Sequence, residues 1–282
     1  MLILSVEIMN ISPEGFNLFL AVMAALAVVV FAALHFVDAG YGKFYSKAWG
    51  PAISNRLGWV LMEAPVFIAM IALWLLCSRK DSICRLVFLL LFELHYFQRS
   101  FIFPFLIKGR SRMPLSIVLM GAVFNTLNAL MQGGWLFYVS PAQMYPTGYL
   151  LDPRFIAGTA LFFAGMFINI QSDSIIRHLR KPGDSAHHLP QKGLFRYVSS
   201  ANYFGELVEW IGFAVLPWSA GGARRPHPQT VSAGVSGRIQ PPQSQKADSF
   251  CLVIIVICRQ AVPSENLCHL GTFGRGSAMI SI

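Results

Sequence analysis

Six apolar runs, each close to the length that crosses a bilayer, constrain this sequence more than any other feature. A transmembrane helix needs about 20 consecutive, mostly apolar residues. Only 12% of the 282 residues are charged, whereas soluble proteins have about 25%. Short connectors containing glycine or proline separate the runs, which lie near residues 16–36, 57–77, 86–107, 115–139, 155–172 and 203–221. The sequence therefore predicts an all-α, multi-pass transmembrane helical bundle with six spans.

The net charge of +9 arises mostly from basic residues in the connectors and does not indicate nucleic-acid binding. Eleven basic residues lie in the first, third and fifth connectors, against four in and beside the second and fourth. Because lysine and arginine concentrate in cytoplasmic loops, the N-terminus is expected outside and the odd connectors in the cytoplasm. The first run is too long for a signal peptide and follows acidic residues, so we expect a retained span. The five cysteines lack the spacing of a metal site or a disulfide framework.

The composition changes after residue 222. The next 27 residues are rich in proline, serine, glutamine and glycine, which is typical of a disordered segment. The apolar segment Phe250–Cys258 is too short to span a membrane as a helix, and its β-branched residues favour aggregation. We therefore expect a membrane-embedded domain at residues 1–222 and a disordered tail at residues 223–282.

The third apolar run contains ionisable residues that a simple membrane helix does not need. The stretch LFELHYFQRSFIF carries Glu93, His95, Tyr96 and Arg99. A charge at the centre of a bilayer costs about 2.5–3.5 kcal/mol even on the mildest scale. Helical spacing places Glu93, Tyr96, Arg99 and Phe103 on one face. These residues either clamp one helix to another or face a polar ligand.

Two other runs raise the same choice between a structural and a functional role. Glu63 lies in the second run just before Ala64 and a proline, where it is either a helix-end carboxylate or a carboxyl group held in a dry pocket. Near the end of the fifth run, Asn169, Asp173 and Arg180 lie along one stripe. A solvated helix end with one salt bridge would look similar.

The sixth run places Asn202, Glu206 and Glu209 on one helix face. Two carboxylates on an intramembrane face are costly unless they meet a cation, an amide or a ribose hydroxyl. The sequence contains no dinucleotide fingerprint, P-loop, HExxH or GxSxG motif, so no motif of this kind identifies a nucleotide cofactor.

Three motifs, ELHYFQRSFIFPF, RKPGD and KGLFRYVSSANYFGE, together resemble the membrane steroid 5α-reductases (3-oxo-5α-steroid 4-dehydrogenases). The elements EAPVF and INIQSD agree with this resemblance, which covers roughly residues 36–218. It implies a seven-helix membrane fold that binds NADPH from the cytoplasmic side. It also implies reduction of the C4–C5 double bond of a 3-oxo-Δ4 steroid, with hydride added to C5.

The resemblance further implies roles for individual residues. Tyr96 and Glu63 would hydrogen-bond to the 3-oxo group, which makes C5 electrophilic and stabilises the developing enolate. Tyr96 or a water would then provide a route for the proton to C4. The arginines at the cofactor positions would pair with phosphates, and Asn202 and Glu206 would hold the nicotinamide end. The residues that match cofactor positions of the family are Arg99, Arg110, Asn169, Asp173, Arg180, Asn202 and Glu206.

The sequence departs from the family pattern in two places. The family continues with a seventh helix, an Arg/His-rich segment with aromatic pairs, and an Ile-Pro-Phe close, none of which occurs in residues 223–282. His187 stands where relatives often have tyrosine. Because the missing region lines the family's cofactor pocket, we expect weak NADPH binding and little turnover.

Two alternatives stay open on sequence grounds. One is a related membrane reductase of enoyl-lipids or polyprenols, although Glu63 and HYFQRSFIFPF favour the steroid branch. The other is a catalytically impaired isoform without the last helix. The expected partners are a steroid or sterol-like lipid and the membrane itself, with no nucleic acid, metal or obligate protein partner. The expected location is the endoplasmic reticulum membrane of a eukaryote or the cytoplasmic membrane of a bacterium.

Overall fold

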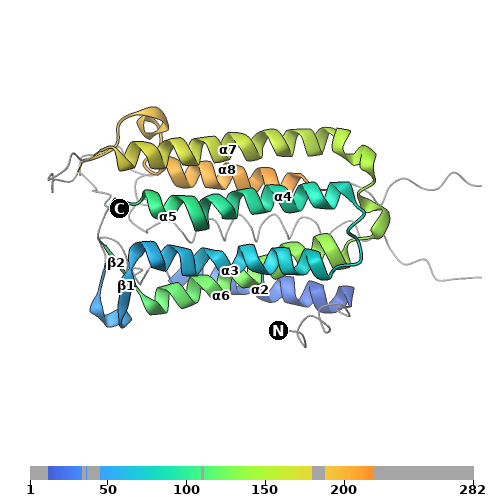
Figure 1. Ribbon diagram of the computed structural model, residues 1–282, viewed down its shortest axis with the longest axis horizontal. Coiled ribbons are helices and arrows are strands. Elements are labelled where there is room, and N and C mark those ends of the chain that lie inside the picture. Colours follow the sequence, from blue (N-terminus) through green and yellow to red (C-terminus); the bar gives the residue numbers. More distant parts are fainter. Residues whose placement is uncertain (1–11, 34–35, 37–44, 109–110, 180–187, 219–282) are drawn as a thin grey trace, which may run out of the picture.

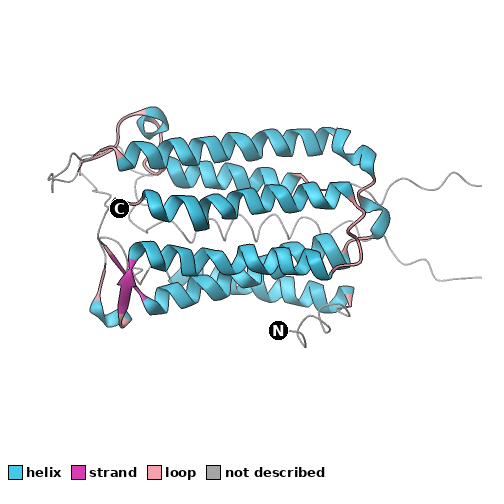
Figure 2. Cartoon of the chain, viewed as in Figure 1, coloured by secondary structure: helices cyan, strands magenta, loops and turns pink. Residues whose placement is uncertain are grey.

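Long helices form the part of the chain that the structure describes. The computed structural model describes residues 12–33, 36, 45–108, 111–179 and 188–218. The helices lie side by side along one common direction, and a two-stranded ladder lies at one end of the bundle (Figure 1; Figure 2). The predicted all-α membrane bundle is confirmed.

Within the described ranges the bundle has seven α-helices, and two of them continue into π-helical turns. The α-helices are α2 (Pro13–Ala33), α3 (Asn55–Leu76), α4 (Ile83–Phe97), α5 (Phe103–Leu106), α6 (Leu115–Gly133), α7 (Pro153–Arg177) and α8 (Ala201–Val215). The π-helical turns are η3 (Gln98–Ile102) after α4 and η4 (Gly134–Val139) after α6. The remaining elements are the 3-10 turns η2 (Lys47–Trp49), η5 (Ala142–Met144), η6 (Thr147–Leu151) and η7 (Gly193–Arg196) and the strands β1 (Ala52–Ser54) and β2 (Arg112–Pro114).

The first five predicted runs correspond to helical stretches that are long and apolar enough to cross a membrane. Among the described residues these stretches are Pro13–Ala33, Asn55–Leu76, Ile83–Leu106, Leu115–Val139 and Pro153–Arg177. The sixth run contains α8, whose 15 residues rise about 22 Å, short of the roughly 30 Å of a bilayer core. The number of spans therefore stays a prediction. The expected tail lies outside the described residues.

Side-chain caps in the connectors define where three of the long helices begin. The hydroxyl of Ser54 accepts a hydrogen bond from the backbone N–H of Leu57 at the start of α3, at 3.4 Å. Ser82 accepts in the same way at the start of α4. Asp152 caps α7, and a proline occupies its first turn. Each cap satisfies a backbone donor that has no partner within its own helix.

The β1–β2 ladder aligns α3 with α6. The strands pair antiparallel, with Ala52 opposite Pro114, and each strand leads directly into its helix. The two helices start at this end of the bundle and run side by side in the same direction, with Met62 beside Gly121 and Leu73 beside Gly133 (Figure 1). Residues that follow the two strands by similar distances along the chain consequently meet inside the bundle.

A seam of glycines joins α7 to α8. Gly158 and Gly165 are seven residues apart on α7, and Gly205 and Gly212 are seven residues apart on α8. A Cβ atom on Gly165 would lie 2.1 Å from the backbone nitrogen of Glu209, and one on Gly212 would lie 2.4 Å from that of Phe162. The two backbones are therefore in direct contact, as in membrane helix pairs that pack through small residues.

Hydrogen bonds also close the opposite end of the bundle. The buried guanidinium of Arg85 donates to the carbonyl oxygens of Leu136, at 2.7 Å, and Pro141, at 2.8 Å. The hydroxyls of Tyr145 and Tyr149 donate to backbone carbonyls at the end of α8, each at 2.9 Å. Burial raises the pKa of Tyr149 to about 12. Its hydroxyl therefore remains a donor at neutral pH.

Candidate active site

Polar side chains from five helices meet in the interior of the bundle. They come from α3, α4 with its π-helical turn, α6, α7 and α8. Direct contacts or electrostatic interactions link them, and these are described in turn below. The members of this polar cluster are Glu63, His95, Tyr96, Arg99, Asn125, Asn128, Asn169, Asp173, Asn202, Glu206 and Glu209.

Glu63 reaches the cluster from the middle of α3. The side-chain nitrogen of Asn125 on α6 donates to its Oε2 at 3.1 Å and to the carbonyl oxygen of Met62 at 2.9 Å. Glu63 also interacts electrostatically with Arg99 and His95 on the neighbouring helix. The carboxyl group of Glu63 therefore faces the interior of the bundle, not the membrane interface.

Tyr96 lies near the end of α4 and is only 4% exposed. The side-chain nitrogen of Asn128 on α6 donates to its hydroxyl oxygen at 2.8 Å. The Tyr96 ring packs against Phe92, with centroids 4.7 Å apart, and against Trp210 at 5.7 Å. Because Asn128 is the donor in this bond, the hydroxyl proton of Tyr96 points in another direction.

Asn125 and Asn128 place the two predicted catalytic residues side by side. They are three residues apart on α6, so they share one face of that helix. One contacts Glu63 and the other contacts Tyr96. The sequence analysis did not identify these asparagines. The available signal was two amides three residues apart in an apolar run.

Arg99 lies in the π-helical turn η3 and is buried. Its Nη1 is 3.5 Å from Oδ2 of Asp173 on α7. Its guanidinium carbon lies 4.5 Å from the ring centroid of Phe103 and 4.9 Å from that of Trp59. Arg99 also interacts electrostatically with Glu206 and Glu63. π-Helical turns occur frequently at functional sites, because the extra residue redirects a side chain.

The α7–α8 pair contributes amide and carboxyl groups to the cluster. The side-chain nitrogen of Asn169 donates to the backbone carbonyl oxygen of Asn202 at 3.0 Å, next to the glycine seam. Asp173 forms its ion pair with Arg99 across the bundle, although Arg177 is four residues further along the same helix. The ion pair thus joins α7 to η3, and Arg177 adds an electrostatic attraction from the same helix.

Three charged groups in this region have polar atoms without hydrogen bonds among the described residues. They are Oδ2 of Asp173, Oε2 of Glu206 and Nη1 of Arg177, and all three atoms are buried. Buried polar groups normally find partners, so atoms of this kind indicate a missing ligand or water. Two acceptors and one donor match the hydroxyls and the phosphates of a nucleotide.

His95 and Glu209 form a second buried pair, between α4 and α8. Nδ1 of His95 lies 2.9 Å from Oε1 of Glu209, and both side chains are almost fully buried. The imidazole also contacts the ring of Trp210 edge-on, with centroids 4.7 Å apart. His95 is adjacent to Tyr96 in the chain, and Glu209 is three residues after Glu206. The pair therefore joins the predicted substrate helix to a predicted cofactor helix.

The described part of the chain includes seven of the nine predicted site residues. Arg110 and Arg180 lie outside it, as does His187. No group of three or more His, Cys, Asp or Glu residues that could hold a metal ion occurs in the described ranges. The residues that the structure brings into the cluster are Glu63, Tyr96, Arg99, Asn169, Asp173, Asn202 and Glu206.

Comparison with known proteins finds a matching family model and related proteins. A family model described as 3-oxo-5-alpha-steroid 4-dehydrogenase matches residues 111–224. The chain is 40% identical over 202 residues to 3-oxo-5-alpha-steroid 4-dehydrogenase 1 of Bos taurus, covering 70% of this chain and 77% of that protein. It is 42% identical over 207 residues to 3-oxo-5-alpha-steroid 4-dehydrogenase 2 of Sus scrofa, covering 71% and 79%. It is 35% identical over 210 residues to steroid 5-alpha-reductase DET2 of Gossypium hirsutum, covering 72% and 80%.

Proposed function

Because the chain belongs to the 3-oxo-5-alpha-steroid 4-dehydrogenase family, we propose that it reduces 3-oxo-Δ4 steroids to 5α-steroids with NADPH. The observation that carries this proposal is the pairing of Glu63 and Tyr96 with two amides on one face of α6. This pairing sets two potential hydrogen-bond donors next to each other in a site shielded from bulk water.

Glu63 and Tyr96 would bind the 3-oxo group of the steroid. The Asn128 amide donates to the Tyr96 oxygen, and the Tyr96 hydroxyl would donate to the ketone oxygen of the bound steroid. The Asn125 amide donates to Oε2 of Glu63, which leaves Oε1 to carry a proton when the carboxyl is neutral. Two donors in a medium of low dielectric constant stabilise negative charge that develops on the ketone oxygen.

The cofactor would be held between η3, α7 and α8. When bound, NADPH supplies the hydride for C5. Oδ2 of Asp173, which is 3.5 Å from Arg99, and Oε2 of Glu206 make no hydrogen bond to the described residues and would accept from ribose or carboxamide donors. Nη1 of Arg177 likewise makes no hydrogen bond and would donate to a phosphate oxygen. Arg99 lies beside these acidic groups. Asn169 and Asn202 complete the set with amides. Arg110 and Arg180 join it on sequence grounds as phosphate ligands.

Proton delivery to C4 completes the reduction. One proton and one hydride saturate the C4–C5 double bond, and the 3-oxo group is restored as the enolate collapses. The proton would come from Tyr96 or from a water next to it. The aromatic packing around Tyr96 fixes its position and limits the access of bulk water.

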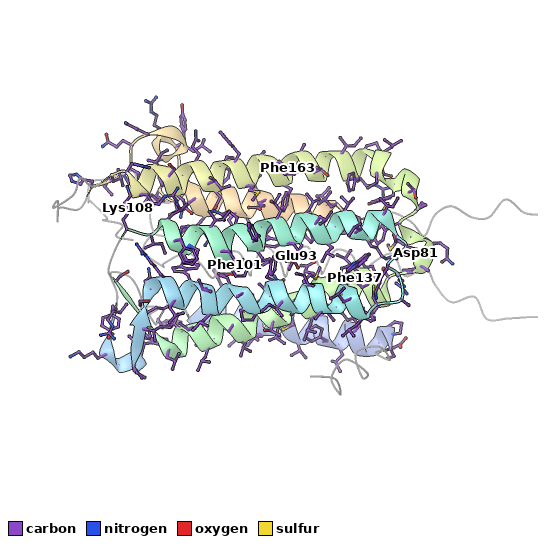
Figure 3. All side chains as sticks on the ribbon, in the orientation of Figure 1. Asp81, Glu93, Phe101, Lys108, Phe137 and Phe163 are labelled. Atoms are coloured by element: carbon purple, nitrogen blue, oxygen red, sulfur yellow. The ribbon has the colours of Figure 1, made fainter. Side chains whose placement is uncertain are left out.

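The chain is a membrane protein, and we infer that its cofactor end faces the cytoplasm. The ends of α4–α5 and α7 lie together at one end of the bundle, where Lys108 is found, and Asp81 marks the other end (Figure 3). The connectors at the Lys108 end carry the excess of basic residues. In a eukaryote this arrangement suits the endoplasmic reticulum membrane, with steroid arriving through the lipid.

A reductase with low turnover is the second candidate function. Residues 223–282 do not carry the closing pattern of the family, which supplies basic and aromatic residues to the cofactor pocket. A related enoyl-lipid or polyprenol reductase would keep the cofactor residues and change the substrate end. Glu63 and Tyr96 together favour the steroid over these lipids, because they match a single ketone oxygen.

The test is steroid-dependent oxidation of NADPH by the purified chain in detergent, with identification of the steroid product by mass spectrometry. We expect slow formation of the 5α-reduced steroid and its loss in Tyr96→Phe and Glu63→Gln. The matched controls are Tyr138→Phe, whose hydroxyl binds the carbonyl of Leu73 away from the cluster, and the exposed Glu14→Gln. NADPH binding without reduction of steroid or polyprenol would identify an impaired isoform. Reduction of polyprenol alone would overturn the steroid assignment.

A further inference from the structure

A second polar level lies one helical turn beyond the Tyr96–Asn128 contact. α4 and α6 run in opposite directions, and the hydrogen bond between Tyr96 and Asn128 aligns them at one height (Figure 1). Glu93 precedes Tyr96 by three residues, and Gln132 follows Asn128 by four. At 1.5 Å per residue, both are displaced by about 4.5–6 Å toward the end of the bundle that carries Asp81. Glu93 and Gln132 therefore occupy similar depths.

Both side chains are buried and have unused hydrogen-bonding capacity. Glu93 is 9% exposed, and neither of its carboxyl oxygens has a hydrogen-bond partner in the described part of the chain. Gln132 is 1% exposed, and its side-chain nitrogen has no partner there either. Figure 3 shows Glu93 between the ribbons of α4 and α3, in the interior of the bundle.

The polar atoms at this level complement each other. The carboxyl of Glu93 offers two acceptors, and the amide nitrogen of Gln132 offers donors. Leaving such groups unpaired in an apolar interior is destabilising, so a ligand that satisfies both is bound more tightly. A hydroxyl group does so, because it donates one hydrogen bond and accepts others.

We propose that Glu93 and Gln132 form a specificity subsite for a hydroxyl group on the middle rings of the steroid. The proposal rests on the proposed function, because it assumes that the 3-oxo group binds at Tyr96 and Glu63. A displacement of one helical turn is shorter than a four-ring nucleus. The subsite therefore lies beside the B and C rings and does not reach the D-ring end. Carbons 6, 7, 11 and 12 of these rings can each carry a hydroxyl, and position 11 is the one tested below.

Gln132 belongs to the amide series that already organises the site. Asn125, Asn128 and Gln132 follow one another at i, i+3 and i+7 on a single face of α6. The first amide contacts Glu63, and the second contacts Tyr96. Gln132 therefore lies on the same face of α6 as the two amides that contact Glu63 and Tyr96.

The test compares steroids that differ by one hydroxyl. Purified full-length chain in detergent with NADP⁺ binds tritiated 11-deoxycorticosterone, and unlabelled 11-deoxycorticosterone, corticosterone and its 11α-epimer compete. We expect one 11-hydroxylated epimer to bind about tenfold more tightly than the deoxy steroid. We expect this ratio to fall to near one in Glu93→Leu and in Gln132→Leu. Thr159→Val, which removes another buried and unpaired polar atom on α7, should keep the ratio.

The outcomes separate the subsite from the function. If the chain binds all three steroids equally, the subsite is wrong and the proposed function stands. An unchanged ratio in both leucine variants would also overturn the subsite, since other residues would then recognise the 11-hydroxyl. Absence of binding by any 3-oxo-Δ4 steroid would overturn the proposed function and the subsite together. If a leucine variant does not fold, the ratio of the steroid affinities is measured in Glu93→Gln, which keeps the size of the side chain.

Discussion

The hydroxyl oxygen of Tyr96 and the side-chain nitrogen of Asn128 lie 2.8 Å apart, joining α4 to α6 in the interior of the bundle. An asparagine in this place acts on the reaction through the tyrosine. It fixes the hydroxyl oxygen as an acceptor on one side, so the proton is presented on another. The orientation of Tyr96 thus depends on a residue from a different helix.

Replacing Asn128 by leucine should lower kcat with a smaller change in KM. The leucine removes the donor to the Tyr96 hydroxyl oxygen, and hydrogen bonds of this kind contribute about 1–1.5 kcal/mol, which corresponds to roughly five- to tenfold. Steady-state kinetics of steroid reduction measure the effect. Thr126→Val is the control, because its hydroxyl binds only the carbonyl of Ala122 on its own helix. A purely structural role would instead lower the yield of folded protein without changing kcat.

Gly165→Ala should destabilise the bundle strongly. The new Cβ would lie 2.1 Å from the backbone nitrogen of Glu209 and 2.5 Å from the carbonyl oxygen of Gly205, so α7 and α8 must separate. Overpacking of this kind costs about 1–3 kcal/mol or more. Thermal unfolding in detergent should show a lower Tm than for Gly148→Ala, where the added Cβ has no neighbour within 4 Å. Equal Tm values would show that the helices do not pack this closely.

Arg99 and Asp173 should be energetically coupled in cofactor binding. They lie 3.5 Å apart and both are buried, so a change in either should weaken NADPH binding, and the double variant should not be additive. Arg99→Met, Asp173→Asn and the double variant form the cycle, with NADPH affinity as the readout and an expected coupling of about 0.5–3 kcal/mol. Asp152→Asn breaks the more exposed pair with Arg154 and should leave affinity unchanged. Strict additivity of the two changes would argue against a shared binding site.

Glu209→Ala should destabilise the protein more than Glu209→Gln. The carboxylate lies 2.9 Å from Nδ1 of His95 in a buried site, and removing one partner leaves the other without compensation, at a cost of about 3–5 kcal/mol. Glutamine keeps an oxygen at a similar position. The double variant His95→Phe with Glu209→Leu should recover stability, because it removes both polar groups. Thermal unfolding of the four proteins is the measurement, and equal losses in Ala and Gln variants would contradict the pairing.

The sequence was sufficient to predict the membrane bundle and much of the polar cluster. Apolar runs report directly on helices in lipid, and ionisable residues inside such runs are conspicuous because they are costly. Glu63, Tyr96 and Arg99 were identified in this way and through the family resemblance, and their roles remain predictions. The predicted run 203–221 and α8 (Ala201–Val215) begin within two residues of each other and differ at the end, because apolar residues continue past the point where the helix stops before Pro217.

The partners of these residues could not be predicted, because they depend on packing between distant segments. The contacts of Asn125 and Asn128 depend on the alignment of α3 and α6 by the short β ladder. No local sequence pattern predicts this alignment. The glycine seam was present as two pairs of glycines seven residues apart. Nothing in either helix alone shows that these glycines face each other.

The ladder and the seam also divide the bundle mechanically. The β1–β2 pairing fastens α3 to α6, and backbone contact through Gly165 and Gly212 fastens α7 to α8. Side chains of α4 connect the two pairs through Asn128 and Glu209. Backbone contacts thus hold each pair together, whereas the connection between the pairs depends on side chains and can be removed by single substitutions.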